Sequence, residues 1–424
     1  ILTDYHANWS YEILRNHVEL LDNKDYALMV RTVDLETDNF EENVKWVSQH
    51  AYDFLKKTKV FWWEIIINKV GSAGKVYLMP YLNRPVSLWM NAFMLRLRGG
   101  FDINYVYAFL ISKHWTNLIK QRITWAVPPS IDKQSVRSIL IPIPSEKFQK
   151  FVSNLIKSYQ EENIKSKSLY KEAENLLLKK LNLLDWKWTE KNIDIKSSNE
   201  VKLYWRFDAE FFQPKYDELF ERLSKFDTQK LWEIVDYEKG VEPWTGEYTD
   251  NDWVPFVRVS DVNIQWIQDI EKKISFDLVK SYYWKYSPKK DEILFTKDWT
   301  IWISFVVNED MNVILSSAFL KFKKKADIES EYLALILNSI ICKLQIERLS
   351  GGAIIAHLKP SDAMTLKVPI LSPTIQSKIS SLIISSHEAL NKSKELLEKA
   401  RRAVEVFIEK DEESAMKEIW DIIS

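Results

Sequence analysis

The segments EIIINKVGSAGKV (64–76) and EILFTKDWTIWIS (292–304) decide the organisation of the chain, because they are two copies of one pattern. In each copy a glutamate opens a short apolar run and a lysine closes it, and both pairs are 228 residues apart in the chain. Turn residues after the lysine lead into a second apolar run, which is typical of a strand–turn–strand unit.

Three further matches follow this pair in the same order along the chain. They are YALMVRTVDL with WVPFVRVSDV, MNAFMLRL with SSAFLKFK, and WAVPPSIDKQSVRSILIPIP with GAIIAHLKPSDAMTLKVPIL, at 26–35 and 253–262, 90–97 and 316–323, and 125–144 and 352–371. Self-similarity at a nearly constant offset is the signature of an internal repeat. The sequence therefore predicts a tandem duplication of about 227 residues.

Each copy consists of short β-type runs, then a Pro-bounded strand, then a long segment of helical periodicity. The two helical segments, 145–184 and 373–413, have apolar residues three and four apart and contain no Gly and no internal Pro. A 40-residue helix is roughly 60 Å long, so each one needs a long partner. We expect the two helices to pair as an antiparallel coiled coil; the alternative is that each packs on its own β-rich domain.

The predicted fold class is α+β, with two tandem β-rich domains that are each followed by a long helix. The first β-rich domain spans 1–144 and the second spans 202–372. The polar, aperiodic segment 185–201 is predicted to be a linker, and 414–424 is predicted to be a C-terminal tail.

Composition excludes several classes of protein. The 424 residues carry a net charge of −1 and one cysteine, Cys342, so an intramolecular disulfide and a Cys-rich zinc site are excluded. No apolar run is long enough for a membrane span, and the first residues do not resemble a signal peptide, so we expect a cytoplasmic protein without membrane contact. Any DNA-binding surface must be a local patch, because the overall charge is close to zero.

Sequence patterns of enzymes and cofactor sites are missing. The chain has no GxGxxG, P-loop, HExxH or CxxC pattern, and its six histidines lack the spacing of metal ligands. We therefore expect no catalytic residues, no metal and no cofactor.

The content of tryptophan and glycine is abnormal. The chain contains 18 Trp and 8 Gly, whereas an average Gly content of about 7% would give roughly 30. When the two copies are aligned, Gly71 and Gly74 correspond to tryptophans of the second copy, and Gly352 corresponds to Trp125 of the first copy. We hypothesise that many tryptophans are encoded by UGA codons that some bacterial lineages read as glycine; the candidates are Trp9, Trp62, Trp63, Trp89, Trp125, Trp205, Trp232, Trp244, Trp266, Trp299 and Trp302. The alternative is a tryptophan-rich surface on which bases stack.

Two β-rich domains, each followed by a long helix, resemble the specificity (S) subunit of type I restriction–modification systems. The Gly-punctuated strand–turn–strand EIIINKVGSAGKVYLMP, its counterpart KDWTIWIS, and the runs VPFVRVSDV and YWRFDAEFFQPKYDELFERL also look like that family. The resemblance spans nearly the whole chain. Family members usually begin with Met and a short strand–helix lead-in, whereas this sequence starts at Ile1, so we expect an N-terminal piece to precede it.

The resemblance implies a function in sequence-specific DNA recognition. In that family each β-rich domain is a target recognition domain that reads one half of a split site in double-stranded DNA, and the paired helices set the gap. The subunit has no catalytic centre; it docks two adenine-methylating modification subunits and, with them, restriction subunits. One alternative is the recognition half of a fused methyltransferase–nuclease. Another is a β/coiled-coil scaffold that binds only proteins, for which no salt-dependent DNA affinity is expected.

The candidate DNA contacts are basic residues beside turns and strand ends. They are Arg31, Lys69, Arg122, Lys133 and Arg137 in the first copy, and Arg258, Lys289, Lys290, Lys297, Arg348, His357 and Lys359 in the second. Residues that differ between the copies are expected to choose the DNA sequence, and shared residues to hold the fold or bind phosphate.

Each candidate has a plainer interpretation. An Arg can bind guanine bidentately or hold a phosphate, but Arg31 and Arg258 each precede an aspartate by three residues, so an internal Arg–Asp pair is the alternative. The lysines are alternatively solvated charges, and His357 is alternatively a surface histidine.

Overall fold

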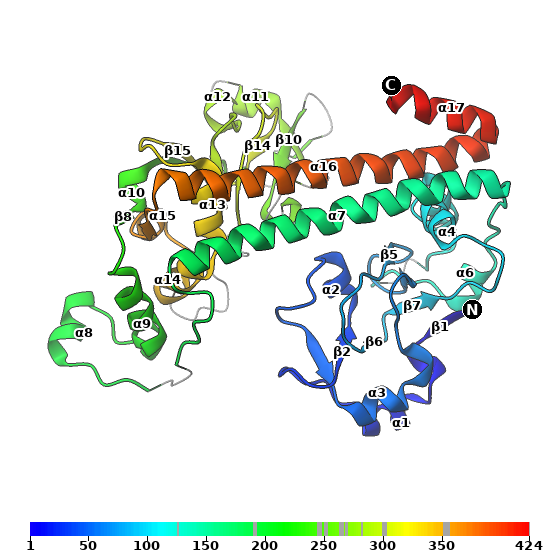
Figure 1. Ribbon diagram of the computed structural model, residues 1–424, viewed down its shortest axis with the longest axis horizontal. Coiled ribbons are helices and arrows are strands. Elements are labelled where there is room, and N and C mark those ends of the chain that lie inside the picture. Colours follow the sequence, from blue (N-terminus) through cyan, green and yellow to red (C-terminus); the bar gives the residue numbers. More distant parts are fainter. Residues whose placement is uncertain are drawn as a thin grey trace. The chain divides into compact units, whose positions relative to one another are not determined.

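The computed structural model describes residues 1–124, 127–189, 193–243, 248–249, 253–262, 267, 270–280, 283–298, 303–350 and 357–423 (Figure 1). The chain forms two compact units. Unit 1 comprises residues 1–163 and 391–424, and unit 2 comprises residues 164–390. Each unit therefore contains one β-rich region and one half of each long helix, a division that the sequence did not predict.

Two sheets form the β-rich part of unit 1. The first has four antiparallel strands in the order β1-β7-β4-β5, at Leu2–Asp4, Ala92–Leu95, Ile65–Asn68 and Val76–Leu78. The second has the order β3-β2-β6, at Lys45–Val47, Ala27–Val30 and Val86–Leu88, and its β2–β6 pair is parallel. The strands are rich in Ile, Val and Leu, and most of their residues are buried, as expected for strands packed into a core.

Unit 2 repeats this arrangement. Its four-stranded antiparallel sheet has the order β9-β15-β12-β13, at Val235–Lys239, Phe319–Lys324, Ile293–Thr296 and Ser304–Val306. Its second sheet has the order β11-β10-β14, at Lys273–Ser275, Trp253–Val257 and Ile314–Leu315, again with one parallel pair. Equivalent strands occupy equivalent places in the two units, as the repeat predicts.

Shorter helices surround the sheets. In unit 1 they are α1 (Tyr11–His17), α2 (Thr32–Glu36), α3 (Gln49–Phe54), α4 (Ile103–Leu110), α5 (Lys113–Lys120), α6 (Lys133–Arg137) and α17 (Glu412–Ile423). In unit 2 they are α8 (Ser198–Tyr204), α9 (Pro214–Leu223), α10 (Leu231–Ile234), α11 (Phe276–Val279), α12 (Tyr283–Tyr286), α13 (Ser330–Asn338), α14 (Ile340–Ser350) and α15 (Pro360–Ala363). No helix in the described part of the chain is long and apolar enough to cross a bilayer.

The long helices α7 (Glu146–Lys180) and α16 (Pro373–Glu409) lie side by side and antiparallel (Figure 1). Within unit 1, the Phe148 ring lies 5.1 Å from the Phe407 ring, and Glu162 forms a 2.6 Å ion pair with Lys392. Within unit 2, the hydroxyls of Ser166 and Ser386 lie 3.1 Å apart. The predicted antiparallel pairing is confirmed.

Each half of the helix pair also covers the core of its own unit, so the two interpretations from the sequence are compatible. In unit 1, Phe148 and Val404 belong to one buried cluster with Ile65 and Phe93 of the sheet. In unit 2, residues of α7 and α16 join Ile293, Phe295 and Phe322 in the corresponding cluster.

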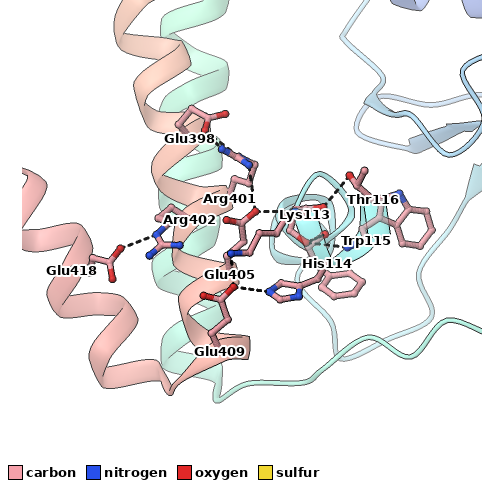
Figure 2. A network of polar contacts seen from close by, with 12 residues as sticks. Lys113, His114, Trp115, Thr116, Glu398, Arg401, Arg402, Glu405, Glu409 and Glu418 are labelled. Atoms are coloured by element: carbon pink, nitrogen blue, oxygen red, sulfur yellow. Dashed lines mark hydrogen bonds and ion pairs between the residues drawn. The ribbon is translucent and has the colours of Figure 1, made fainter. Parts of the chain in front are cut away.

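A polar network attaches the end of α16 to α5 in unit 1 (Figure 2). The backbone N–H of Lys113, in the first turn of α5, donates to the buried Glu405 carboxylate over 2.8 Å. The Lys113 ammonium lies 2.5 Å from Glu409 and lowers the pKa of that carboxyl below its usual range. A carboxylate at a helix N-terminus is stabilised by the helix dipole, so the network fixes α16 against the β-rich part of unit 1.

Two segments differ from the sequence-based expectation. The segment predicted to be a C-terminal tail forms the helix α17. This helix is held in unit 1 by the buried Ala415 and Ile419 and by a 2.7 Å hydrogen bond from Arg402 to Glu418. In unit 2 the Pro-bounded segment forms β16 (Lys367–Pro369), which pairs with β8 (Thr228–Lys230). Its counterpart in unit 1 is not assigned as a strand, because no strand among the described residues pairs with it.

The backbone bears on the glycine hypothesis at two candidate positions. Trp63 has φ +70° and Trp205, at the end of α8, has φ +50°. Asp291 occupies the place of Trp63 in unit 2, with φ +68° and the same bond from its backbone N–H to the opposite strand. A bulky side chain is unfavourable in this left-handed region, whereas Gly is the usual residue there.

The glycines of the first copy support the same hypothesis. A Cβ on Gly74 would lie 2.2 Å from a methyl group of Ile119, and Gly71 has φ +84°. The candidates Trp125, Trp244, Trp266, Trp299 and Trp302 lie outside the described residues.

We expect Trp63→Gly to raise the free energy of unfolding by about 1–2 kcal/mol, the cost of the left-handed backbone for a residue with a side chain. Thermal melts of both forms check this. Trp46→Gly is the matched control, because Trp46 is buried, is not a candidate and should lose stability. The intact mass of the natural protein tests the hypothesis itself: it should fall below the mass of the printed sequence by one indolylmethyl group per recoded position, and equality of the two masses would contradict recoding.

Candidate nucleic-acid interface

A shared carboxylate holds two of the candidate lysines in unit 1. Lys69 follows β4 and Lys133 begins α6, and their ammonium groups lie 3.6 and 2.8 Å from the buried Asp4 of β1. Both side chains remain 29% exposed. Two cations on one anion leave a net positive charge at this edge, which suits a phosphate.

The equivalent place in unit 2 has a different arrangement. Lys297 is 2% exposed and its ammonium lies 2.5 Å from Asp298. The other carboxylate oxygen of Asp298 contacts Nδ1 of His357, whose side chain is 58% exposed. The buried Lys297 cannot reach a phosphate on the surface, so we leave it out of the proposed interface.

The backbone around the two lysines is the same. The N–H of Lys69 donates to Asn91 O and that of Lys297 to Ala318 O, both over 2.8 Å. A later segment of each unit then pairs with the lysine itself. Ile131 N–H donates to Lys69 O in unit 1, and Leu358 N–H donates to Lys297 O in unit 2. The repeat therefore brings residues 130–133 and 357–359 next to the lysine turns.

The two arginines of the repeat make internal pairs with aspartates. Asp34 accepts hydrogen bonds from the N–H, Nε and Nη2 of Arg31, at 2.8, 3.1 and 2.6 Å. Arg258 bonds Asp261 in the same way, at 2.8, 3.4 and 3.1 Å. Both aspartates are buried, and the arginine side chains are 24% and 34% exposed. These pairs brace the start of a helical turn, and their contact with DNA stays a prediction.

Arg348 is buried among aromatic rings. Its guanidinium carbon lies 4.3 Å from the Phe211 ring centre and 5.1 and 5.2 Å from the rings of Tyr204 and Phe220. The residue is 8% exposed, and Asp217 is its ion-pair partner at 3.8 Å. Arg348 thus anchors the segment before β8, and we leave it out of the proposed interface too.

The remaining candidates lie at the surface. Arg137 donates to Leu2 O over 3.0 Å, and Arg122 donates to Leu118 O over 2.8 Å. Lys290 and Lys359 are exposed. The Lys290 backbone N–H and the Lys289 ammonium both bind Asp310 and lower the pKa of its carboxyl.

A cleft of about 680 Å³ lies in unit 2 beside the Asp298 pair. Its walls include Arg258, Ser260, Ser316, Tyr248 and Asp298. Asp4 and Asp298 were not among the site residues predicted from the sequence. Asp298 directly follows Lys297 and could have been noticed, whereas nothing in the sequence links Asp4 with lysines 65 and 129 residues away. The described residues hold no group of three or more His, Cys, Asp or Glu that could bind a metal ion.

Comparison with known proteins gives one family. Residues 224–399 match the model of the type I restriction modification DNA specificity domain. This match confirms the resemblance found in the sequence. No curated protein matches the chain.

Several solved structures are similar over long stretches. The type I restriction–modification S subunit from M. genitalium is 14% identical, with 95% of this chain and 94% of that chain covered and a TM-score of 0.40. The HsdS subunit from Thermoanaerobacter tengcongensis is 12% identical, with 94% and 95% covered and a TM-score of 0.28. The type IIG restriction endonuclease BpuSI is 10% identical, with 48% and 35% covered and a TM-score of 0.33.

Proposed function

Residues 224–399 carry a type I restriction–modification DNA specificity domain, and from this premise we propose that the chain is the sequence-specificity subunit of such a system. The repeat is the observation that carries the proposal. Unit 1 has the strand order, the parallel strand pair and the lysine turn of unit 2, which contains most of the matched residues. A chain with two such domains has one reader for each half of a split DNA target.

The long helices supply the spacer in this proposal. A helix rises about 1.5 Å per residue, so the lengths of α7 and α16 would set the distance between the half-sites, as dimer geometry does for other DNA-binding proteins. Two adenine methyltransferase subunits, and with them restriction subunits, would dock on the chain and supply the catalysis. The chain itself would bind double-stranded DNA and perform no chemistry.

DNA affinity should depend steeply on salt, because phosphate contacts release counterions. We expect Lys290→Ala and Lys359→Ala each to reduce the slope of log K against log salt by about 1, with affinity lowered alike for all sequences. Fluorescence anisotropy of the complex with its methyltransferase on duplex DNA measures both effects.

Lys225→Ala is the matched control, since Lys225 is an exposed lysine of unit 2 outside the proposed interface, and its slope should stay that of the unaltered chain. Absence of salt-dependent affinity for duplex DNA would contradict the proposed DNA binding and favour the protein-binding scaffold.

A further inference from the structure

The two units differ in chemistry at one place where their backbones coincide. Val70 and Ser130 form an isolated antiparallel bridge in unit 1, and Asp298 and His357 form the equivalent bridge in unit 2. The lysine before each bridge is shared, and so are the hydrogen bonds that hold it. The framework is therefore common, while two side chains on it have changed from an apolar group and a hydroxyl to a carboxylate and an imidazole.

We propose that this position determines specificity. The Asp298–His357 pair contacts a base of the second half-site, and the Val70–Ser130 pair contacts the corresponding base of the first half-site. This inference rests on the proposed function. If the halves of the target differ, some residues that choose bases must differ between the units, and this bridge is a place where the side chains differ while the backbone stays the same.

The chemistry of the pair suits base recognition. An ionised carboxylate only accepts hydrogen bonds, so Nδ1–H of His357 donates to Asp298 and the ring is held with Nε2 available for a ligand. Asp298 is itself fixed by the buried Lys297 over 2.5 Å. A side chain whose orientation is fixed by a second hydrogen bond, as the imidazole of His357 is by Asp298, can discriminate between the donor and acceptor patterns of base edges.

The surroundings also suit this role. His357 is 58% exposed, and Asp298 lines the 680 Å³ cleft together with Arg258 and Ser316. In unit 1, Val70 and Ser130 are partly exposed at the equivalent place. An aliphatic side chain there could contact a thymine methyl group, which an acid–imidazole pair would not favour.

The test exchanges the two bridges and maps the methylated adenines. The chain with Asp298→Val and His357→Ser is co-expressed with its adenine methyltransferase, and genomic methylation is compared with that of the unaltered chain. Base discrimination should change by about tenfold or more at one position of the second half-site. The first half-site and the gap should stay the same. Val70→Asp with Ser130→His should alter only the first half-site.

Controls separate the possible failures. His357→Ser alone changes an exposed side chain, so it keeps the fold, which a thermal melt verifies. Lys359→Ala, at a predicted phosphate contact, should lower the level of methylation without altering the motif. An unchanged motif in the folded variants would overturn the inference and make the pair a structural contact, and so would loss of all methylation at an unchanged melting temperature. Absence of a split motif with the unaltered chain would instead contradict the proposed function.

Discussion

Phe148→Ala should lower the free energy of unfolding of unit 1 by about 3–5 kcal/mol, the usual cost of removing a buried aromatic ring. Phe148 is 0% exposed, and its ring packs against Phe407 across the two long helices. The cavity would lie where α7, α16 and the sheet of unit 1 meet. Calorimetry and urea titration of the full chain measure the loss.

A double-mutant cycle with Phe407→Ala tests the helix pairing itself. Two packed aromatic rings should show a coupling energy of about 0.5–1.5 kcal/mol. Lys147→Ala, an exposed neighbour on α7, is the control and should change stability by less than about 0.5 kcal/mol. A loss below about 1 kcal/mol for Phe148→Ala, or no coupling, would contradict the antiparallel pairing of α7 and α16.

Asp34→Ala should cost about 3 kcal/mol, because it removes the carboxylate that pairs with the Arg31 guanidinium and leaves the Arg31 backbone N–H without its acceptor in a mostly buried site. Asp34 is 3% exposed and accepts three hydrogen bonds from Arg31, whose Nη2 also donates to Asn43 O over 2.6 Å. Arg31→Ala should also destabilise unit 1, and the cycle of the two variants should show a coupling above about 1 kcal/mol. Chemical denaturation of the four proteins measures these values.

The same cycle separates the two roles of the arginine. If Arg31 braces the fold, DNA affinity of the folded Arg31→Ala protein should change little once stability is accounted for. A loss of affinity that depends on the base sequence, without coupling to Asp34, would show that Arg31 contacts DNA. The Arg258–Asp261 pair has the same geometry and gives an independent repetition of the test in unit 2.

The sequence predicted those features that depend on neighbouring residues. Strands such as EIIIN and EILFT, the turn after Lys69 and the helical periodicity of α7 and α16 are local patterns, and their order was repeated within the chain. The first residues of the long helices also lie close to the predicted positions: α16 begins at Pro373, the predicted residue, and α7 begins one residue after the predicted start.

Features that depend on distant contacts were not predictable in this way. The rings around Arg348 come from residues 204–220, which lie far away in the sequence. Asp4 binds lysines of two other segments. The helix α17 is amphipathic but short, and only the contacts of Ala415 and Ile419 with the core show why it forms. A single sequence contains the residues that make such contacts but does not show which of them pair with one another.

The central claim, that two repeated domains read a split DNA target, is tested most directly by mapping methylated adenines. The gene, with glycine wherever the intact mass shows it, is expressed together with the adenine methyltransferase subunit proposed as its partner, in cells without other adenine methylation. Single-molecule sequencing should then find one motif of two short half-sites separated by a fixed unspecified gap. Methylation at a continuous motif, or adenine methylation that does not depend on this chain, would contradict the claim.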